Sequence, residues 1–532
     1  MKRNIIVMIC SVLLIVFMLV GCAEKLQTNS LDDNTNMTQS DTDMDQSDGN
    51  TAQSDANTAD ATIDFNGSSA TVSGIGATVN GSVVTITTAG TYLVSGTLSD
   101  GQLVVETTDT DKVYLVLNGA DLTNKTGAPI YASQCEELII TLADGTTNIL
   151  TDGGADFQYE NTEDEEPNAA LFCKDDLTIN GTGTLTVNAG YNNGIVSKDN
   201  LLIEGGNLTV TAANHGLKGN DSVTILSGTF NVTADNDAIH SNGDITVDGG
   251  TFTIVSGDDG IHADGDLTVN DGSITVTDAY EGLEATNIFI TGGEFDLTTS
   301  DDALNAAGGA DQSDGGGKFG NDTFTEGGAY SINISGGNIT LLAGGDGIDS
   351  NGTINISGGN IVSIIDSTPD NEALDSDGGI TFTGGNIIYG GTGAGSAPDS
   401  NSTQSYVFMD SGITAGTEIT VQKDDQTLMT YTPTTTLQYL AFSSPDITSG
   451  ESYKLYSGGS LLSTVTAGEG GSGMMNGGPG DEGMMNGGPR DEGMMDGEPR
   501  DEGMMDGEPR NDEMVDDEMR KGGPGQKPPQ EQ

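Results

Sequence analysis

Acidic side chains recur at a fixed spacing of 22 residues in the middle of this chain. Asp237, Asp259 and Glu281 follow one another at that step, and each precedes a small residue and a branched apolar one. His240 and His262 repeat with the same step. A constant period in this range is typical of stacked structural units, in which equivalent residues lie above one another. The repeat therefore predicts columns of chemically active side chains.

Two main columns are expected, with two shorter ones beside them. The first holds the residue before the small residue of each unit: Asn193, His215, Asp237, Asp259, Glu281, Asp302, Asp346 and Glu372. The second lies three positions further on: Val196, Lys218, His240, His262, Glu284, Asn305, Asp349 and Asp375. The shorter columns contain Asp264 with Asp377, and Asp258 with Asp301.

Stacked carboxylates repel one another, so their negative charge must be neutralised. In-register strands lie about 4.8 Å apart, and two carboxylates at that distance repel by about 3–4 kcal/mol at an effective dielectric near 20. Protonation would require raised pKa values at many residues at once, whereas a divalent cation neutralises several together. Clusters of carboxylate oxygens suit Ca²⁺, which takes about six to eight oxygen ligands. We therefore predict Ca²⁺ sites formed by Asp237, Asp259, Asp264, Glu281, Glu284, Asp301 and Asp302, and by Asp346, Asp349, Asp375 and Asp377.

Two other interpretations of these columns remain open. The acids are also able to cap turns and face water, because Asp and Asn side chains satisfy backbone groups of loops. His240 and His262, one repeat apart, are alternatively a pair of transition-metal ligands, since imidazole suits such metals.

The elements that carry the columns are short strands. Each unit contains three β-branched runs separated by turns, as in the strand 266–269 and the strand 273–276. A glycine pair such as Gly249-Gly250 recurs at one turn, as expected where φ is positive or backbones approach closely. Three strands and three turns in 22 residues predict an all-β parallel β-helix. Leucine-rich repeats of similar length would show a Leu/Asn signature and a helical segment, which are missing.

The chain divides around this array. We expect regular repeats over 169–391, interrupted by an insertion at about 306–328, and less regular β-helix coils over 61–168. A small antiparallel β module at 402–463 would cap the open end. The polar segment 23–60 is expected to be a disordered tether, and the Met/Gly/Pro/acidic tail 470–532 a disordered spacer. The Met-Met pairs of the tail are alternatively Cu(I) ligands.

The N-terminus has the pattern of an export signal. Lys2 and Arg3 precede an apolar run over 5–20 that is short for a spanning helix. The run ends in Leu-Val-Gly-Cys at 19–22, which resembles the lipobox of bacterial lipoproteins and implies cleavage before Cys22 and its lipidation. An ordinary signal peptide or a single anchor helix are the alternatives. Cys135 and Cys173 remain, either as a disulfide or as two buried thiols.

The amino-acid composition limits the kinds of molecule that the chain can bind. The 532 residues include 17 basic and 81 acidic side chains, for a formal net charge of −64, and no Trp. Such a surface repels nucleic acid and anionic lipid headgroups and attracts cations. Binding to nucleic acid is therefore not expected, and we expect a monomer.

The stretch 89–102 and the coil motif (D/N)(D/E)(G/A)(I/L) resemble a bacterial family of carbohydrate-binding domain-containing proteins, over about 61–459. The resemblance implies a right-handed parallel β-helix similar to polysaccharide lyases, Ca²⁺ sites, and binding to plant cell-wall polysaccharides such as cellulose or acidic pectin. His215 and Asn193 depart from the acidic motif. The motif positions in this chain are Asp237, Asp259, Glu281, Asp302 and Asp346.

Together these observations predict a non-catalytic, Ca²⁺-dependent carbohydrate-binding protein, extracellular and lipid-anchored to the cell membrane through Cys22. Tyr191 and Tyr280 are candidates for contact with the sugar. One alternative is a pectate-type polysaccharide lyase with Lys218 as the base, since such chemistry needs a basic group at the α-proton. The other is a surface adhesin or spacer without a glycan ligand.

Overall fold

The structure is a computed structural model, which describes residues 59–108, 110–307, 329–365, 371–393 and 395–470. The expected signal sequence, the lipidation site Cys22, most of the tether 23–60, nearly all of the tail 470–532 and most of the insertion 306–328 lie outside these residues. The described part is built almost entirely from β-strands, with one short 3₁₀ helix, η1 (Gly154–Asp156). Within it, no helix is long and apolar enough to span a membrane.

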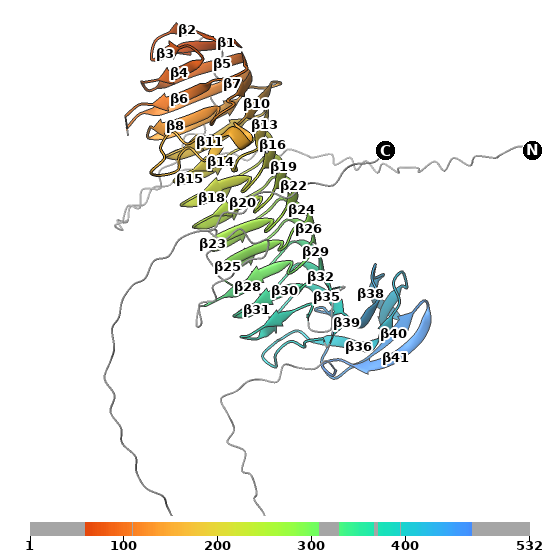
Figure 1. Cartoon of the computed structure of the whole chain (residues 1–532). Coiled ribbons are helices and arrows are strands. Elements are labelled where there is room, and N and C mark those ends of the chain that lie inside the picture. The colour runs from red at the N-terminus through yellow and green to blue at the C-terminus, as the bar shows by residue number, and fades with distance from the viewer. Residues whose placement is uncertain (1–58, 109, 308–328, 366–370, 394, 471–532) are drawn as a thin grey trace, which may run out of the picture. The chain divides into compact units, whose positions relative to one another are not determined.

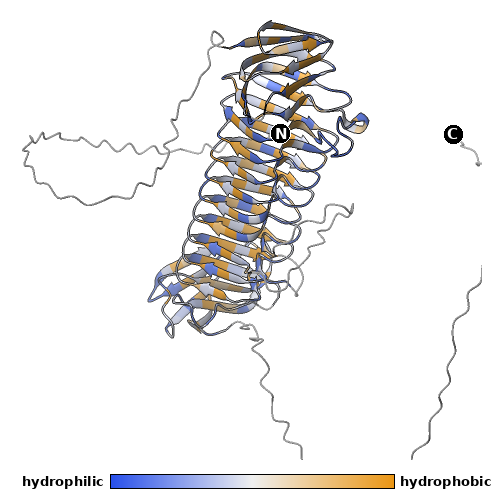
Figure 2. Cartoon of the chain, turned by 90° about the vertical axis from the view of Figure 1, so that its left-hand side faces the viewer, coloured by the Kyte–Doolittle hydropathy of each residue, from blue (hydrophilic) through white to orange (hydrophobic). Residues whose placement is uncertain are grey.

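Strands form because apolar and polar residues alternate in short β-branched runs. Along β16 (Asn207–Ala212) the residues are exposed and buried in turn, with Leu208 and Val210 inside and the threonines outside. The same alternation repeats in the next coil, where Leu208 pairs with Phe230 and Val210 with Val232. Figure 2 shows hydrophobic and hydrophilic residues alternating along the strands. Period 2 places one set of side chains in the core and the other in solvent.

Successive coils pair in parallel and build three sheets (Figure 1). The first sheet contains β4 (Val83–Ile86), β6 (Gln102–Glu106), β8 (Ile130–Gln134), β11 (Ala169–Cys173), β14 (Asn193–Ser197), β17 (Leu217–Gly219), β20 (Ile239–Ser241), the start of β23 (Ile261–Val269), the start of β25 (Leu283–Ile290), β27 (Leu304–Ala306), β30 (Ile348–Ser350) and β33 (Asp375–Ser376).

The second sheet contains β1 (Ala61–Gly67), β5 (Gly90–Leu98), β7 (Lys112–Thr123), β9 (Glu137–Leu142), β12 (Asp176–Gly181), β15 (Asn200–Ile203), β18 (Ser222–Ile225), β21 (Asp244–Val247), the ends of β23 and β25, β28 (Ser331–Ile334), β31 (Thr353–Ile356) and β34 (Ile380–Phe382). The third contains the end of β7, β10 (Thr147–Thr151), β13 (Thr184–Ala189), β16, β19 (Thr229–Ala234), β22 (Thr251–Ser256), β24 (Ser273–Asp278), β26 (Glu294–Thr298), β29 (Asn338–Ala343), β32 (Asn360–Ile365) and β35 (Asn386–Gly391). The parallel β-helix expected from the repeat is confirmed.

Glycines fit two kinds of position in each coil. Gly228, in the turn before β19, has φ +135°, and a Cβ there would lie 2.8 Å from the Phe230 ring. Gly216 belongs to the small-residue column, where a Cβ would meet Val232 Cγ1 at 2.4 Å and the Ala238 carbonyl at 2.5 Å. Positive φ and close backbone approach, the two reasons expected from the sequence, therefore both occur.

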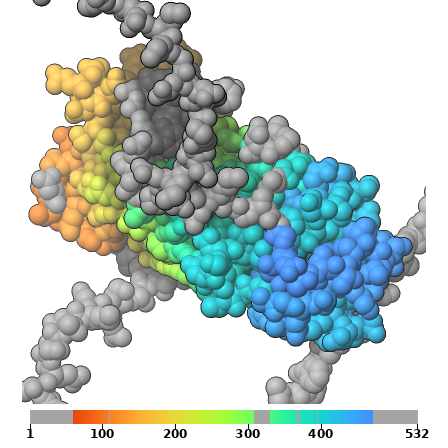
Figure 3. All heavy atoms as spheres, turned by 90° about the horizontal axis from the view of Figure 1, so that it is seen from below, coloured from red at the N-terminus to blue at the C-terminus, as the bar shows by residue number. Residues whose placement is uncertain are grey.

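Antiparallel strands close the two ends. At the start, β2 (Ala70–Gly74) pairs with β1, and β3 (Ala77–Asn80) with β4. At the other end, β39 (Leu437–Ser443) pairs antiparallel with β35 and with β36 (Tyr406–Ile413). A four-stranded sheet follows, made of β37 (Ile419–Lys423), β38 (Gln426–Tyr431), β40 (Ser452–Ser457) and β41 (Ser460–Thr466). Figure 3 shows this module in blue beside the last coils. These strands lie at 406–466, in the region where the sequence predicts a small antiparallel β module.

The two remaining cysteines are free thiols in the core. Cys135 and Cys173 are both buried. Burial, with a hydrogen bond between the two thiols, raises the pKa of Cys173 well above its ordinary value. Of the two possibilities open from the sequence, the structure has the pair of buried thiols.

Candidate metal centre

The second column lies on the first sheet in unbroken register. His240 pairs with His262, His262 with Glu284, and Glu284 with Asn305. The same register continues through Asp349 to Asp375. Because paired residues on parallel strands point to the same face, these side chains form one ladder, as the 22-residue repeat predicts.

The first column lies in the turn that leads from the third sheet into the first. Backbone bonds tie consecutive members together, as between Ala238 N–H and the Asp259 carbonyl at 3.0 Å. The carboxylates take part too. Asp237 Oδ1 accepts the N–H of Asp259 at 3.1 Å, and Asp302 Oδ1 accepts the N–H of Asp346. One oxygen of Asp237 and one of Asp302 thus join two coils, as in the turn-capping interpretation, and the second oxygen of each is left for another partner.

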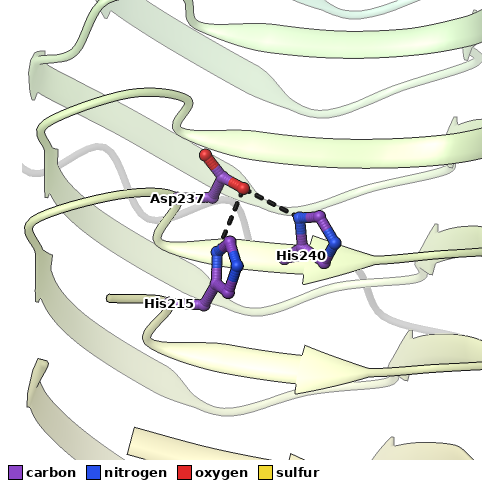
Figure 4. A group of neighbouring side chains, drawn as sticks. All are labelled: His215, Asp237 and His240. Carbon is purple, nitrogen blue, oxygen red and sulfur yellow. Dashed lines mark hydrogen bonds and ion pairs between the residues drawn. The ribbon is translucent and has the colours of Figure 1, made fainter. Parts of the chain in front are cut away.

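At Asp237 that partner is imidazole. Asp237 Oδ2 lies 3.1 Å from His215 Nδ1 and 2.8 Å from His240 Nδ1 (Figure 4). All three side chains are buried. The group does not consist of oxygen ligands alone, because His215 belongs to the first column and His240 to the second, and both rings turn toward the acid between them. In the sequence, His215 stands out only as a departure from the acidic motif.

Ionisation in this group follows from burial and pairing. Burial lowers the pKa of His215 to about 4, although Asp237 opposes the shift. Burial alone would raise the pKa of Asp237, but the contacts of its carboxylate with His215 and His240 outweigh burial and hold that pKa well below its ordinary value. At neutral pH the group therefore contains a carboxylate and, at His215, a neutral ring.

One coil further on, His262 lies among three carboxylates. Its Nδ1 is 2.9 Å from Asp259 Oδ2 and 2.7 Å from Glu284 Oε2, and its Nε2 is 3.2 Å from Asp264 Oδ1. Burial would lower the pKa of His262, but these hydrogen bonds raise it well above its ordinary value. An imidazolium therefore compensates acids that were expected to need a metal ion. His240 and His262 do stack, with centroids 5.1 Å apart, but their Nδ1 atoms face different carboxylates.

Asn305 lies in the ladder between Glu284 and Asp349, and Glu281 of the first column contacts it. Asn305 Nδ2 donates to Glu281 Oε1 at 3.0 Å. The amide oxygen of Asn305 is buried and has no hydrogen-bond partner. Asp259, Glu281 and Glu284 also place ligand atoms within 4.8 Å of one another.

Asp302, Asp346 and Asp349 form a half-buried group without an imidazole. Their ligand atoms lie within 4.8 Å of one another. Burial raises the pKa of Asp302 to about 8, of Asp346 to about 6 and of Asp349 to about 7, and neighbouring carboxylates add to each shift. Among the described residues, no basic side chain forms an ion pair with these three. Three oxygen donors without a compensating charge fit a hard cation such as Ca²⁺.

Three further predicted ligands, Asp301, Asp375 and Asp377, lie near this group. Asp375 follows Asp349 in register. Asp377 is exposed, and its charge contributes to the raised pKa of Asp349. Asp301 is half-buried, and its hydrogen bond to Tyr280 raises the pKa of that phenol.

Lys218 and the aromatic residues complete the surroundings. Lys218 is half-buried and pairs in register with Val196 and His240. Tyr191 stacks on Phe157 with ring centroids 4.4 Å apart, so one of its faces is covered. Its hydroxyl donates to Tyr159 at 2.6 Å.

Three comparisons with known proteins show what this chain is similar to. A family model described as carbohydrate-binding domain-containing protein matches residues 80–327. A carbohydrate-binding domain-containing protein of Acetivibrio thermocellus is 46% identical over 129 residues, which make up 24% of this chain and 45% of that protein. The chain thus spans about half the length of this relative. A solved structure of a polysaccharide lyase-like protein from C. thermocellum, a gadolinium derivative, is 37% identical with a TM-score of 0.42, over 43% of this chain and 96% of that one.

Proposed function

We propose that this chain is a non-catalytic, Ca²⁺-dependent carbohydrate-binding protein of the cell surface, because a family model described as carbohydrate-binding domain-containing protein matches residues 80–327. Its ligand is an acidic polysaccharide of the pectin type. The group of Asp302, Asp346 and Asp349 carries the proposal, because three adjacent carboxylates there have no basic partner within the described residues.

Ca²⁺ would reduce the electrostatic repulsion between the acidic chain and an acidic polysaccharide. The chain has a formal net charge of −64, so it repels a polyuronate in the absence of cations. A Ca²⁺ ion held by Asp302, Asp346 and Asp349 uses part of its oxygen coordination on the protein. The remaining positions are open to water or to sugar carboxylates. The site is half-buried, which leaves room for that exchange.

Tyr280 is the better candidate for contact with the sugar. It lies beside Asp301, at the edge of the same acidic group. Tyr191, the other aromatic residue expected from the sequence, already has one face covered by Phe157. A half-buried tyrosine supplies an apolar ring together with a polar tip for such contacts.

Binding to immobilised polygalacturonate tests this proposal. We expect retention of the chain in CaCl₂ and release in EDTA. The double variant Asp346→Asn/Asp349→Asn should lose retention, whereas Asp271→Asn, which removes an exposed acid on another turn, should keep it. Retention that is insensitive to EDTA, or equal in both variants, would show that the acidic group does not mediate binding.

Lyase activity on the same scaffold is the second candidate, because Lys218 is half-buried next to His240 in the ladder. A lyase also needs a group that holds the substrate carboxylate near the base. The sequence has no arginine between residues 4 and 489, and Asp349 of the proposed Ca²⁺ group is separated from Lys218 in the ladder by His240, His262, Glu284 and Asn305. We therefore favour binding. Incubation with polygalacturonate and Ca²⁺, followed by the ultraviolet absorbance of unsaturated uronates, distinguishes the two.

Attachment to the membrane through a lipid on Cys22 would place this binding surface outside the cell. The lipobox-like residues 19–22 support that part of the proposal. Growth with a radioactive fatty acid should label the wild-type chain but not Cys22→Ala. An unlabelled wild-type chain would exclude the anchor.

A further inference from the structure

We propose that His215, Asp237 and His240 form a buried site for a transition-metal dication, with Zn²⁺ as its best-fitting occupant. The site is separate from the proposed Ca²⁺ group and does not depend on glycan binding. It takes one ligand from each of two histidines and one from a carboxylate, a donor set that suits Zn²⁺ and that Ca²⁺ disfavours.

The three ligand atoms converge on one point. His215 Nδ1 and His240 Nδ1 both approach the same oxygen, Asp237 Oδ2, at 3.1 and 2.8 Å (Figure 4). The two rings are stacked, with centroids 4.3 Å apart and an interplanar angle of 28°. His215 is 3% exposed, His240 4% and Asp237 0%. Solvent therefore has little access to the nitrogens and the oxygen that meet there.

The Nδ1 atom of His215 lacks a hydrogen bond in this arrangement. It lies 3.1 Å from Asp237 Oδ2 without forming a hydrogen bond to it. A buried polar atom without a partner is costly. A metal ion between the ring and the carboxylate would satisfy the nitrogen lone pair.

The position of the hydrogen on the His240 ring also bears on metal binding. His240 Nε2 lies 3.0 Å from Asn242 Oδ1, an acceptor, so Nε2 carries the hydrogen. Nδ1 faces the Asp237 carboxylate 2.8 Å away, either as the second N–H of an imidazolium or, in the neutral ring, through a lone pair. A cation, which is a proton or a metal ion, is therefore needed between these two atoms. A hydrogen bond from the distal ring nitrogen to a carbonyl oxygen is also the usual support of a metal-bound histidine.

The spacing is close to that of a tetrahedral site. Zinc–ligand bonds of about 2.0–2.1 Å place tetrahedral ligand atoms about 3.3 Å apart. The observed 2.8 and 3.1 Å are slightly shorter, so a Zn²⁺ ion requires the three side chains to move apart by a few tenths of an ångström. The positive charge of Lys218, which lowers the pKa of His215, also opposes the ion.

Metal titration of the full chain, stripped with a chelator, tests the site. With Co²⁺ as a probe, we expect the visible absorption bands of a nitrogen-ligated tetrahedral ion, which Zn²⁺ then displaces and Ca²⁺ does not. Asn242→Ala, which removes only the supporting hydrogen bond, should weaken Zn²⁺ binding by about 10–100-fold. His215→Ala and His240→Ala should abolish the bands.

Two controls separate this site from the proposed Ca²⁺ group. Asp346→Asn/Asp349→Asn should keep the Co²⁺ bands while losing the response to Ca²⁺. Circular dichroism identifies any histidine variant that does not fold. In that case the Zn²⁺ affinity of Asn242→Ala decides whether the site exists. Absence of the Co²⁺ bands in the wild-type chain, or unchanged bands and Zn²⁺ affinity in a folded Asn242→Ala, His215→Ala or His240→Ala variant, would overturn the proposal.

Discussion

The backbone N–H of Asp346 donates to Oδ1 of Asp302, so an acid of one coil holds the acid that follows it in the first column. Asp237 and Asp259 have the same relationship at 3.1 Å. A carboxylate in this column therefore has two tasks, because one oxygen joins the coils and the other faces a cation, a proton or an imidazole. An Asp→Asn substitution keeps an oxygen that accepts the backbone N–H but removes the negative charge, so it separates the two roles.

Asp302→Asn should remove the Ca²⁺ response but leave the fold intact. The asparagine carbonyl still accepts the Asp346 N–H, while the repulsion between neighbouring carboxylates disappears. Asp302→Ala also removes the acceptor, and leaving the buried N–H unpaired should cost about 1–3 kcal/mol. Urea denaturation in EDTA should rank the three proteins as Asp302→Asn equal to or above wild type, and Asp302→Ala lowest. If Asp302→Ala matches wild type, the bond between the coils does not contribute to stability.

The pH dependence of stability follows from the same group. The pKa values of Asp302, Asp346 and Asp349 are raised to about 8, 6 and 7 from an ordinary value of 3.8. The folded protein thus binds these protons more tightly than the unfolded chain. Their stabilising contribution is fully present below the unfolded pKa and is lost as the pH rises through the folded values.

In EDTA, the melting temperature should therefore fall between about pH 5 and pH 8. Ca²⁺ competes with protons for the same oxygens, so the rise in melting temperature on adding Ca²⁺ should be larger at pH 8 than at pH 5. Differential scanning fluorimetry measures both. In Asp346→Asn/Asp349→Asn the fall with pH should be smaller and the effect of Ca²⁺ absent. A Ca²⁺ effect that is equal at both pH values contradicts the assignment.

Much of this arrangement follows from the period alone. Parallel in-register strands force residues 22 apart onto one ladder, so the stacking of His240, His262 and Glu284 was predictable. Ring orientation was not, because χ angles are independent of the repeat. The turn of His215 toward Asp237 depends on those angles. Asn242 carries a signal that was available, since it stands two residues after His240 as Asp264 does after His262.

The register also shifts where the sequence suggests a uniform array. In β23 and β25 the strand continues through the corner between the first and second sheets, and the pairing slips by one residue between Ala263 and Asp266. The cause is visible in the sequence, because this coil is one residue shorter. The local pattern does not show at which turn the residue is missing.

Phe252→Ala tests the stacked core that keeps the coils in register. Its ring lies parallel to that of Phe230, with centroids 4.6 Å apart and an interplanar angle of 8°. Because both side chains are fully buried, the cavity should lower the free energy of unfolding by about 3–5 kcal/mol. Thr253→Ala, at the next and exposed position, should change it by less than about 0.5 kcal/mol. Chemical denaturation measures both, and equal values would mean that the column relaxes into the space.

Lys218→Ala separates the binding and lyase interpretations. As a lysine next to His240 in the ladder, Lys218 is the basic group that a lyase mechanism would use, whereas the proposed Ca²⁺ group does not require it. We expect retention on polygalacturonate to be unchanged by the substitution, and neither the wild type nor the variant to generate unsaturated product. Unsaturated product from the wild type that disappears in Lys218→Ala would assign the protein to the lyases, with Lys218 as the base. Removal of this positive charge should also strengthen Zn²⁺ binding at His215, Asp237 and His240, because the ammonium group no longer repels the ion.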